Sequence, residues 1–165
     1  MTSRRTANRV WNLRVNILAA SPLIHGHVRE RLLRSGGVNP NGTSIRPGVY
    51  FASDLVTFGS GGLVERHVTF ENREHVSIGS RVYIGPECYI GTSSHEVAGP
   101  QQRAGAYKGA GVKIEDGCWI GARAVVLPGI TISRGCVIAA GSVVTRTTEP
   151  NGLYAGVPAT RKKDL

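Results

Sequence analysis

Histidine side chains are the groups in this sequence best suited to proton transfer at neutral pH. His67, His75 and His95 lie in the middle of the chain, while His25 and His27 lie in a basic N-terminal segment. A positioned imidazole is the commonest general base in enzymes and contributes about 10²–10⁴ in rate. Three histidines also match the number of protein ligands of a catalytic zinc ion. At this level a general base and a zinc site both remain open.

Three cysteines, at positions 88, 118 and 136, are a second possible source of chemistry. Their number is odd and their spacing matches no metal-binding motif. All three fall at the small inward position of the repeat described next, where a thiol acts as a compact hydrophobe. We therefore expect buried core thiols rather than nucleophiles. Free thiols fit a reducing compartment, so we expect a cytoplasmic protein.

A six-residue repeat defines the elements that must position these groups. A helix repeats every 3.6 residues and a lone strand every 2, so neither explains a sustained period of six. Six is typical of a hexapeptide β-helix, in which three repeats make one triangular coil. Between residues 112 and 144 the aliphatic positions are Ile114, Ile120, Val126, Ile132, Ile138 and Val144, and the small or β-branched positions two residues earlier are Val112, Cys118, Ala124, Ile130, Cys136 and Ser142.

The same register occurs upstream and is interrupted twice. Ile78, Ile84 and Ile90 continue it, but Phe70 is two residues out of phase with Ile78, which predicts a short insertion near residues 72–76. Residues 93–110 lose the pattern and are polar and Gly-rich, which predicts an excursion from a coil. His95 lies at the start of this excursion, where a side chain can project into a cleft.

Composition and charge predict one domain with an appended arm. No stretch approaches 18 apolar residues, and no signal-peptide core is present. Residues 1–36 hold seven arginines against one glutamate, with helices expected over 6–20 and 23–34; residues 37–165 form the main domain. We favour an arm that packs on the β-helix or on a neighbouring subunit, and we keep an anionic membrane surface open. Nucleic acid is disfavoured, because no binding motif is present and aromatics are few.

Three blocks carry a family resemblance: CWIGARAVVLPGITI from Cys118, VIAAGSVVTR from Val137 and YAGVPATR from Tyr154. Together with the His-bearing excursion they resemble the hexapeptide-repeat acyltransferases, specifically the maltose, galactoside and nodulation-type O-acetyltransferases, over about residues 48–161. The resemblance implies an all-β fold, a left-handed parallel β-helix. It also implies a homotrimer in which acetyl-CoA lies in a cleft between adjacent β-helices.

The resemblance assigns acceptor-side roles. His95 matches the catalytic histidine, the base for an acceptor hydroxyl. Glu65 stands where many relatives carry an asparagine that contacts the acceptor or the oxyanion, and an ionised glutamate cannot donate a hydrogen bond there. Glu65 then binds acceptor hydroxyls or a cationic acceptor, or it is an exposed coil residue. Asn72 and His67 are further acceptor-binding candidates, although Asn72 also suits the turn that absorbs the register slip.

On the donor side the resemblance points to CoA. Trp119 matches a tryptophan beside the pantetheine arm, with packing between subunits as the alternative. Arginine binds phosphate in a bidentate manner, so basic residues suit the CoA phosphates. The remaining donor-side residues are Ala122 and Ala140 through their backbone amides, Thr145 and Arg146 near the phosphates, and Arg161 with Lys162 and Lys163 close by.

We therefore expect an acetyl-CoA-dependent O-acetyltransferase acting on a sugar or a glycosylated small molecule, with direct attack in a ternary complex. An N-acetyltransferase acting on an amino sugar or an antibiotic-like amine is the alternative. A γ-carbonic-anhydrase-like zinc enzyme is disfavoured because the paired histidines expected after the excursion are absent, so no metal is expected. A non-catalytic trimeric scaffold remains a further reading. The sequence does not identify the acceptor.

Overall fold

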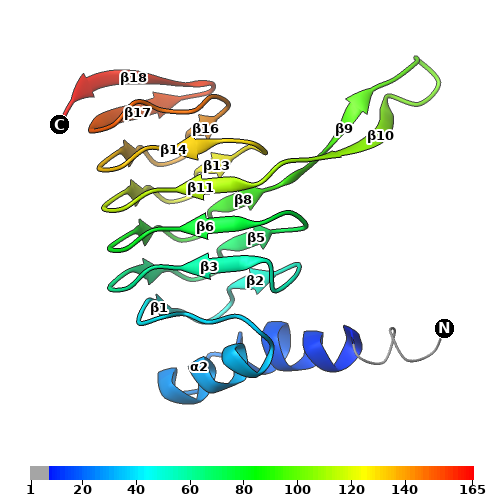
Figure 1. Cartoon of the computed structure of the whole chain (residues 1–165), viewed down its shortest axis with the longest axis vertical. Helices are drawn as coiled ribbons and strands as arrows, with labels where there is room; N and C mark the ends of the chain where they lie inside the picture. The colour runs from blue at the N-terminus through cyan, green and yellow to red at the C-terminus, as the bar shows by residue number, and fades with distance from the viewer. Residues whose placement is uncertain (1–7) are drawn as a thin grey trace.

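The computed structural model describes residues 8–165, and its strands wind into a parallel β-helix with three sheets, A, B and C (Figure 1). The chain visits A, B and C in turn, so the predicted parallel β-helix is confirmed. Sheet A holds β1 (Ser44–Ile45), β4 (Leu63–Val64), β7 (Tyr83–Ile84), β12 (Trp119–Ile120), β15 (Val137–Ile138), β17 (Gly152–Gly156) and the antiparallel β18 (Ala159–Asp164). Sheet B holds β2 (Tyr50–Phe51), β5 (Thr69–Glu71), β8 (Tyr89–Gly91), β13 (Val125–Val126) and β16 (Val143–Val144). Sheet C holds β3 (Val56–Phe58), β6 (Val76–Ile78), β11 (Val112–Ile114) and β14 (Thr131–Ile132).

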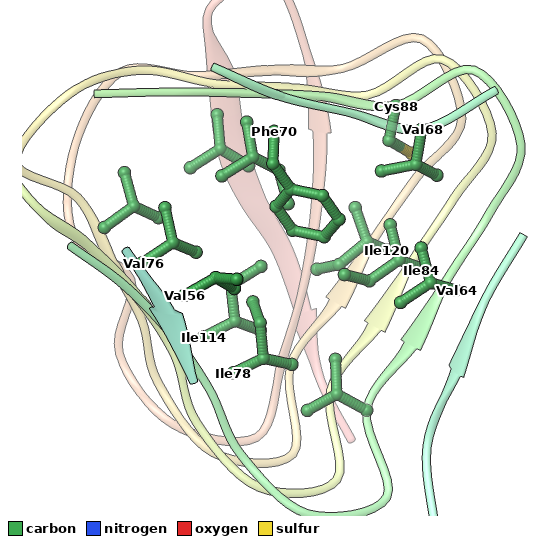
Figure 2. Close-up of a cluster of buried hydrophobic side chains, with 14 of the residues drawn as sticks. Val56, Val64, Val68, Phe70, Val76, Ile78, Ile84, Cys88, Ile114 and Ile120 are labelled. Atoms are coloured by element: carbon green, nitrogen blue, oxygen red, sulfur yellow. The ribbon is translucent and has the colours of Figure 1, made fainter. Parts of the chain in front are cut away.

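The six-residue register forms the core. Ile114, Ile120 and Val126 are fully buried and pair with Ile132, Ile138 and Val144, one coil later. Figure 2 shows such side chains gathered inside the coils. All three cysteines are buried beside them, and burial raises the pKa of the Cys88 and Cys118 thiols to about 11. The expectation of core thiols is confirmed.

The predicted register slip is a widened turn between β5 and β6. Phe70 pairs with Ile90 and Phe58 with Ile78, so this coil is two residues longer than a regular one. Asn72 is fully buried there. Its Oδ1 accepts from the amides of Ala52 (3.0 Å) and Ser53 (3.1 Å), and its Nδ2 donates to the Ser53 carbonyl (2.9 Å).

The turns between sheets stack into three edges, which we call A–B, B–C and C–A after the sheets they join. At the A–B edge one residue per coil has a left-handed backbone, including His67 (φ 60°) and Arg123 (φ 59°). Gly48 occupies this place in the first coil (φ 78°), and a Cβ there would lie 2.5 Å from Nδ1 of His67. Glycine at position 48 adopts this backbone without strain and leaves room for the His67 ring above it.

The N-terminal arm covers the open end of the first coil (Figure 1). Residues 8–12 are α-helical and continue as the π-helix η1 (Leu13–Leu18), and α2 (Gly26–Ser35) follows. Val15 and Leu33 are buried in the common core, and the Asn16 amide pairs with the backbone N–H and C=O of Phe51 on β2. Of the predicted arm, residues 1–7 lie outside the described residues. Within residues 8–165 no helix is long and apolar enough to cross a membrane.

Candidate functional site

His95 lies on a β-hairpin that leaves the solenoid at the B–C edge. The hairpin consists of β9 (Ser93–Val97) and β10 (Ala104–Gly109), and it extends away from the coils between β8 and β11 (Figure 1). The predicted excursion over residues 93–110 is therefore an antiparallel hairpin. The backbone bond from Ala110 N to Thr92 O (2.9 Å) closes its base.

The hairpin holds the His95 ring with Nδ1 2.9 Å from the carbonyl oxygen of Gly105. A carbonyl only accepts hydrogen bonds, so Nδ1 carries the proton and Nε2 has a free lone pair in the neutral ring. The side chain is exposed. The ring of Tyr107, the cross-strand partner of His95, stands edge-on to it with centroids 6.3 Å apart. This arrangement presents an oriented base to whatever approaches the hairpin.

Polar side chains tie the base of the hairpin to the coil below it. Thr92 Oγ1 donates to the Glu71 carbonyl (2.8 Å) and accepts from the Glu74 amide (3.0 Å). Ser93 Oγ donates to Glu71 Oε1 (3.0 Å), and the Tyr107 hydroxyl donates to Glu74 Oε1 (3.1 Å). Sequence reasoning missed these residues, because they lie outside the repeat. The local signal that could have found them is a pair of glutamates, Glu71 just before the predicted insertion and Glu74 inside it.

The A–B edge collects a second group of candidates. Glu65 and His67 lie in the turn after β4, with Glu65 half-buried and His67 exposed. Over the next three coils of this edge, Ala122 and Ala140 line a cleft of about 480 Å³ together with Pro86, Glu87, Arg123 and Gly141. An ion pair between Arg123 and Glu87 (2.8 Å) lies beside this cleft. Small side chains at 122 and 140 leave their backbones accessible to a ligand.

The structure divides the remaining donor-side candidates. Thr145 and Arg146 are exposed and follow β16, at the same B–C edge as His95. Trp119 is 59% exposed on the outer face of sheet A, next to Tyr83 on the neighbouring strand. Within one chain the candidates therefore lie at two different edges of the β-helix and do not meet. Those at the A–B edge are Glu65, His67, Ala122 and Ala140, and those at the B–C edge are His95, Thr145 and Arg146.

Two predicted ligand-binding residues are occupied by other contacts. The Asn72 side-chain amide is hydrogen-bonded to the backbone of Ala52 and Ser53 and is buried. This supports a role for Asn72 in the turn that absorbs the register slip, and not in acceptor binding. Arg161 packs over the Tyr154 ring and bonds Asp164 (2.8 Å) and the Pro150 carbonyl (3.0 Å). Hydrogen bonds to Tyr154 and Asp164 raise the pKa of Arg161. Its guanidinium holds the terminal β17–β18 hairpin together.

Metal-ligating side chains do not cluster in the part of the chain that the structure describes: no group of three or more His, Cys, Asp or Glu is placed to hold an ion. His67 and His95 lie at different edges, and each imidazole stands apart from the other. The geometry around His95 is that of a single imidazole oriented by the Gly105 carbonyl.

Comparison with known proteins yields consistent similarities. Residues 111–146 match a family model described as the hexapeptide repeat of succinyl-transferase. A galactoside O-acetyltransferase from Lactococcus lactis is 33% identical over 123 residues, which make up 73% of this chain and 59% of that protein. The aligned part thus spans less than two thirds of this curated relative.

Two solved structures are similar over nearly the whole chain. A maltose O-acetyltransferase from Clostridium difficile is 28% identical with a TM-score of 0.82, covering 98% of this chain and 86% of that one. A hexapeptide-repeat acetyltransferase from Vibrio cholerae, in complex with acetyl coenzyme A, is 26% identical with a TM-score of 0.87, covering 99% and 90%.

Proposed function

This chain belongs to the hexapeptide-repeat acyltransferase family, and from that premise we propose that it is an acetyl-CoA-dependent O-acetyltransferase acting on a hydroxyl of a sugar or a glycosylated small molecule. The observation that carries the proposal is His95, whose Nδ1 is fixed by the Gly105 carbonyl and whose Nε2 is free. The relatives named above as galactoside and maltose O-acetyltransferases support the choice of acceptor class.

In the proposed reaction His95 Nε2 takes the proton of the acceptor hydroxyl as its oxygen attacks the thioester carbonyl. The new C–O bond forms, the C–S bond breaks, and the imidazolium returns the proton to the departing CoA thiolate. The attack is direct, because the three cysteines are buried and none is placed to take the acyl group.

Acetyl-CoA fits the residues of the A–B edge. The cleft beside Ala122 and Ala140 offers accessible backbone amides, and Trp119 offers an exposed ring on the adjoining sheet. Thr145 and Arg146 at the B–C edge supply a donor and a cation suited to phosphate. Glu65 and His67 are then the acceptor-side residues, because they share an edge with this cleft.

The two edges that carry these groups flank sheet B, and this supports a homotrimer. In a closed ring of three, with sheet B facing the axis, the A–B edge of one copy lies beside the B–C edge of the next. The outer face of sheet B is mostly apolar and suits burial, with Tyr50, Thr69, Tyr89, Val125 and Val143 along it. Sheet C instead presents Thr57, Ser77, Lys113 and Thr131. His95 of one copy would then act on acetyl-CoA held by its neighbour.

Glu65 favours an N-acetyltransferase as the second candidate. Its half-buried carboxylate stands where the family resemblance implies an asparagine, and it is suited to an ammonium group. An amine acceptor bound there would use the same base and donor. Hydroxyl and amine analogues of one sugar, compared as acceptors, separate the two functions.

A cytoplasmic location and a membrane contact complete the proposal. Three free, buried cysteines fit a reducing compartment. The arm buries one face on the solenoid and exposes Leu13, Ile17 and Leu23 beside its arginines, which is suited to an anionic membrane surface. Flotation with anionic liposomes tests this contact. If the protein does not float with the liposomes at low salt, the proposed membrane contact is refuted.

The decisive experiment measures CoA release from acetyl-CoA across a panel of sugars, amino sugars and glycosylated small molecules. We expect acceptor-dependent release that falls at least about 100-fold in His95→Ala. The matched control is His25→Ala, an exposed histidine on the arm, which should retain full activity. Undiminished release in His95→Ala would refute the assigned base, and failure to bind CoA would refute the acyltransferase.

A further inference from the structure

We propose that Tyr107 and Glu74 are positioning residues that hold the His95 imidazole in its productive orientation. This inference rests on the proposed function, in which His95 is the base. Neither residue belongs to the repeat. Both lie at the B–C edge, Tyr107 on β10 and Glu74 in the widened turn before β6.

The need for a support follows from where His95 lies. A two-stranded hairpin is only marginally stable by itself, and most residues of β9 and β10 are exposed. Among residues 8–165 the imidazole makes one hydrogen bond, to the Gly105 carbonyl. The Tyr107 ring provides a second contact, edge-on at an interplanar angle of 87°. Together these contacts restrict rotation of the imidazole about its Cβ–Cγ bond.

Glu74 connects this aromatic pair to the solenoid. The Tyr107 hydroxyl donates to Glu74 Oε1 at 3.1 Å, and the Glu74 amide donates to Thr92 Oγ1 at 3.0 Å. Thr92 is fully buried, and its hydroxyl donates to the Glu71 carbonyl of sheet B. A continuous set of contacts therefore leads from the reactive ring to the rigid coil.

Gly109 leaves room for the contact between Tyr107 and Glu74. A Cβ at position 109 would lie 2.5 Å from the Tyr107 hydroxyl oxygen and 2.6 Å from Glu74 Oε1. The tyrosine and the carboxylate thus meet directly over a residue without a side chain. A tyrosine that only faced solvent would need neither the Glu74 carboxylate nor a glycine at position 109. The local sequence therefore supports a specific contact between Tyr107 and Glu74.

The expected consequence is kinetic. A misplacement of about 1 Å in a reacting group can cost as much as 100-fold in rate. We expect kcat to fall about tenfold in Glu74→Ala and in Tyr107→Phe, and further in Tyr107→Ala, with KM for acetyl-CoA unchanged. The double variant Glu74→Ala/Tyr107→Phe should be no slower than either single variant. Gln101→Ala, in the exposed turn at the hairpin tip, is the matched control.

Two measurements distinguish positioning from a general structural role. In a His95→Ala background, Glu74→Ala should cause no further loss, because its effect passes through the imidazole. Heteronuclear NMR of the ring nitrogens should show the Nδ1–H tautomer in the wild type and a mixture of tautomers in Glu74→Ala and Tyr107→Ala. The inference would be overturned if the tautomer were unchanged in both variants. It would also be overturned if Glu74→Ala lowered the residual activity of His95→Ala as much as it lowers that of the wild type.

The NMR measurement needs no acceptor, so it decides the inference even where no acceptor in the panel is acetylated. Normal turnover in His95→Ala would refute His95 as the base, and failure to bind CoA would refute the acyltransferase, while the tautomer shift would still report whether Tyr107 and Glu74 orient the ring.

Discussion

At the scale of single residues, burial and one carbonyl decide which side chains are reactive. The Gly105 carbonyl selects the tautomer of His95 and leaves Nε2 as the free base. The three thiols, by contrast, face the interior, and for Cys88 and Cys118 desolvation by burial raises the pKa. The imidazole of His95 is therefore accessible to a ligand, whereas the sulfurs of the three cysteines are not.

The residue-scale prediction concerns the thiols. With a pKa of about 11, Cys88 and Cys118 are protonated below that pH, and at pH 8 only about one in a thousand is a thiolate. We expect the native protein to resist alkylation at pH 8 and the denatured protein to react fully, as measured by mass spectrometry. Rapid alkylation without loss of structure would contradict the buried placement.

At the scale of elements, the turn between β5 and β6 absorbs the register slip and supports the hairpin. Asn72 bonds the turn below it, while Glu74 and Glu71 bond the hairpin above it. The two extra residues in this coil thus make room both for the Asn72 hydrogen bonds to the preceding turn and for the glutamate hydrogen bonds to the hairpin. A regular six-residue repeat would have room for neither.

Asn72→Ala tests this turn. The variant leaves the half-buried amide and carbonyl of Ser53 without their partner, while the Ala52 amide keeps its bond to the Phe70 carbonyl (3.0 Å). This loss should cost about 1–3 kcal/mol. Denaturant unfolding measures the loss. The control is the adjacent Arg73→Ala, whose side chain is 69% exposed and which should change stability by less than about 0.5 kcal/mol. Equal stability of both variants would contradict this role of Asn72.

At the scale of the whole molecule, the arm and the solenoid share one core. Val15 and Leu33 are buried with the first coil, and the Arg29 guanidinium, itself buried, bonds the carbonyls of Ala19 (2.7 Å), Ser21 (2.9 Å) and Ile24 (2.8 Å). The arm thus caps an end that would otherwise expose apolar side chains and unpaired strand edges.

A pair of leucines in the arm tests the cap. Leu33 is 2% exposed and Leu23 is 87% exposed. Leu33→Ala should destabilise the protein by about 2–5 kcal/mol in a single cooperative transition. Leu23→Ala should leave thermal unfolding unchanged within about 0.5 kcal/mol. A separate early transition for the arm in Leu33→Ala would argue against one shared core.

Subunit mixing tests whether sites form between copies. His95→Ala disables the B–C edge, and Ala140→Trp fills the cleft at the A–B edge, so each variant alone should be inactive. In a random mixture of copies about one site in four combines two intact edges, and activity should return to about a quarter of wild type. Activity that stays near zero after denaturation and refolding together would place each site within one chain.

The sequence determined the β-helix, the inward positions and the place of His95 at the start of an excursion, because each depends on a local period of six. The hydrogen bonding of Asn72 to the preceding turn, the contact between Tyr107 and Glu74 and the separation of Glu65 from His95 were decided only by the tertiary structure. Tyr107 and Glu74 are 33 residues apart and meet only because the coils stack. Burial of Asn72 likewise depends on a neighbouring turn 19 residues earlier, which no local pattern encodes.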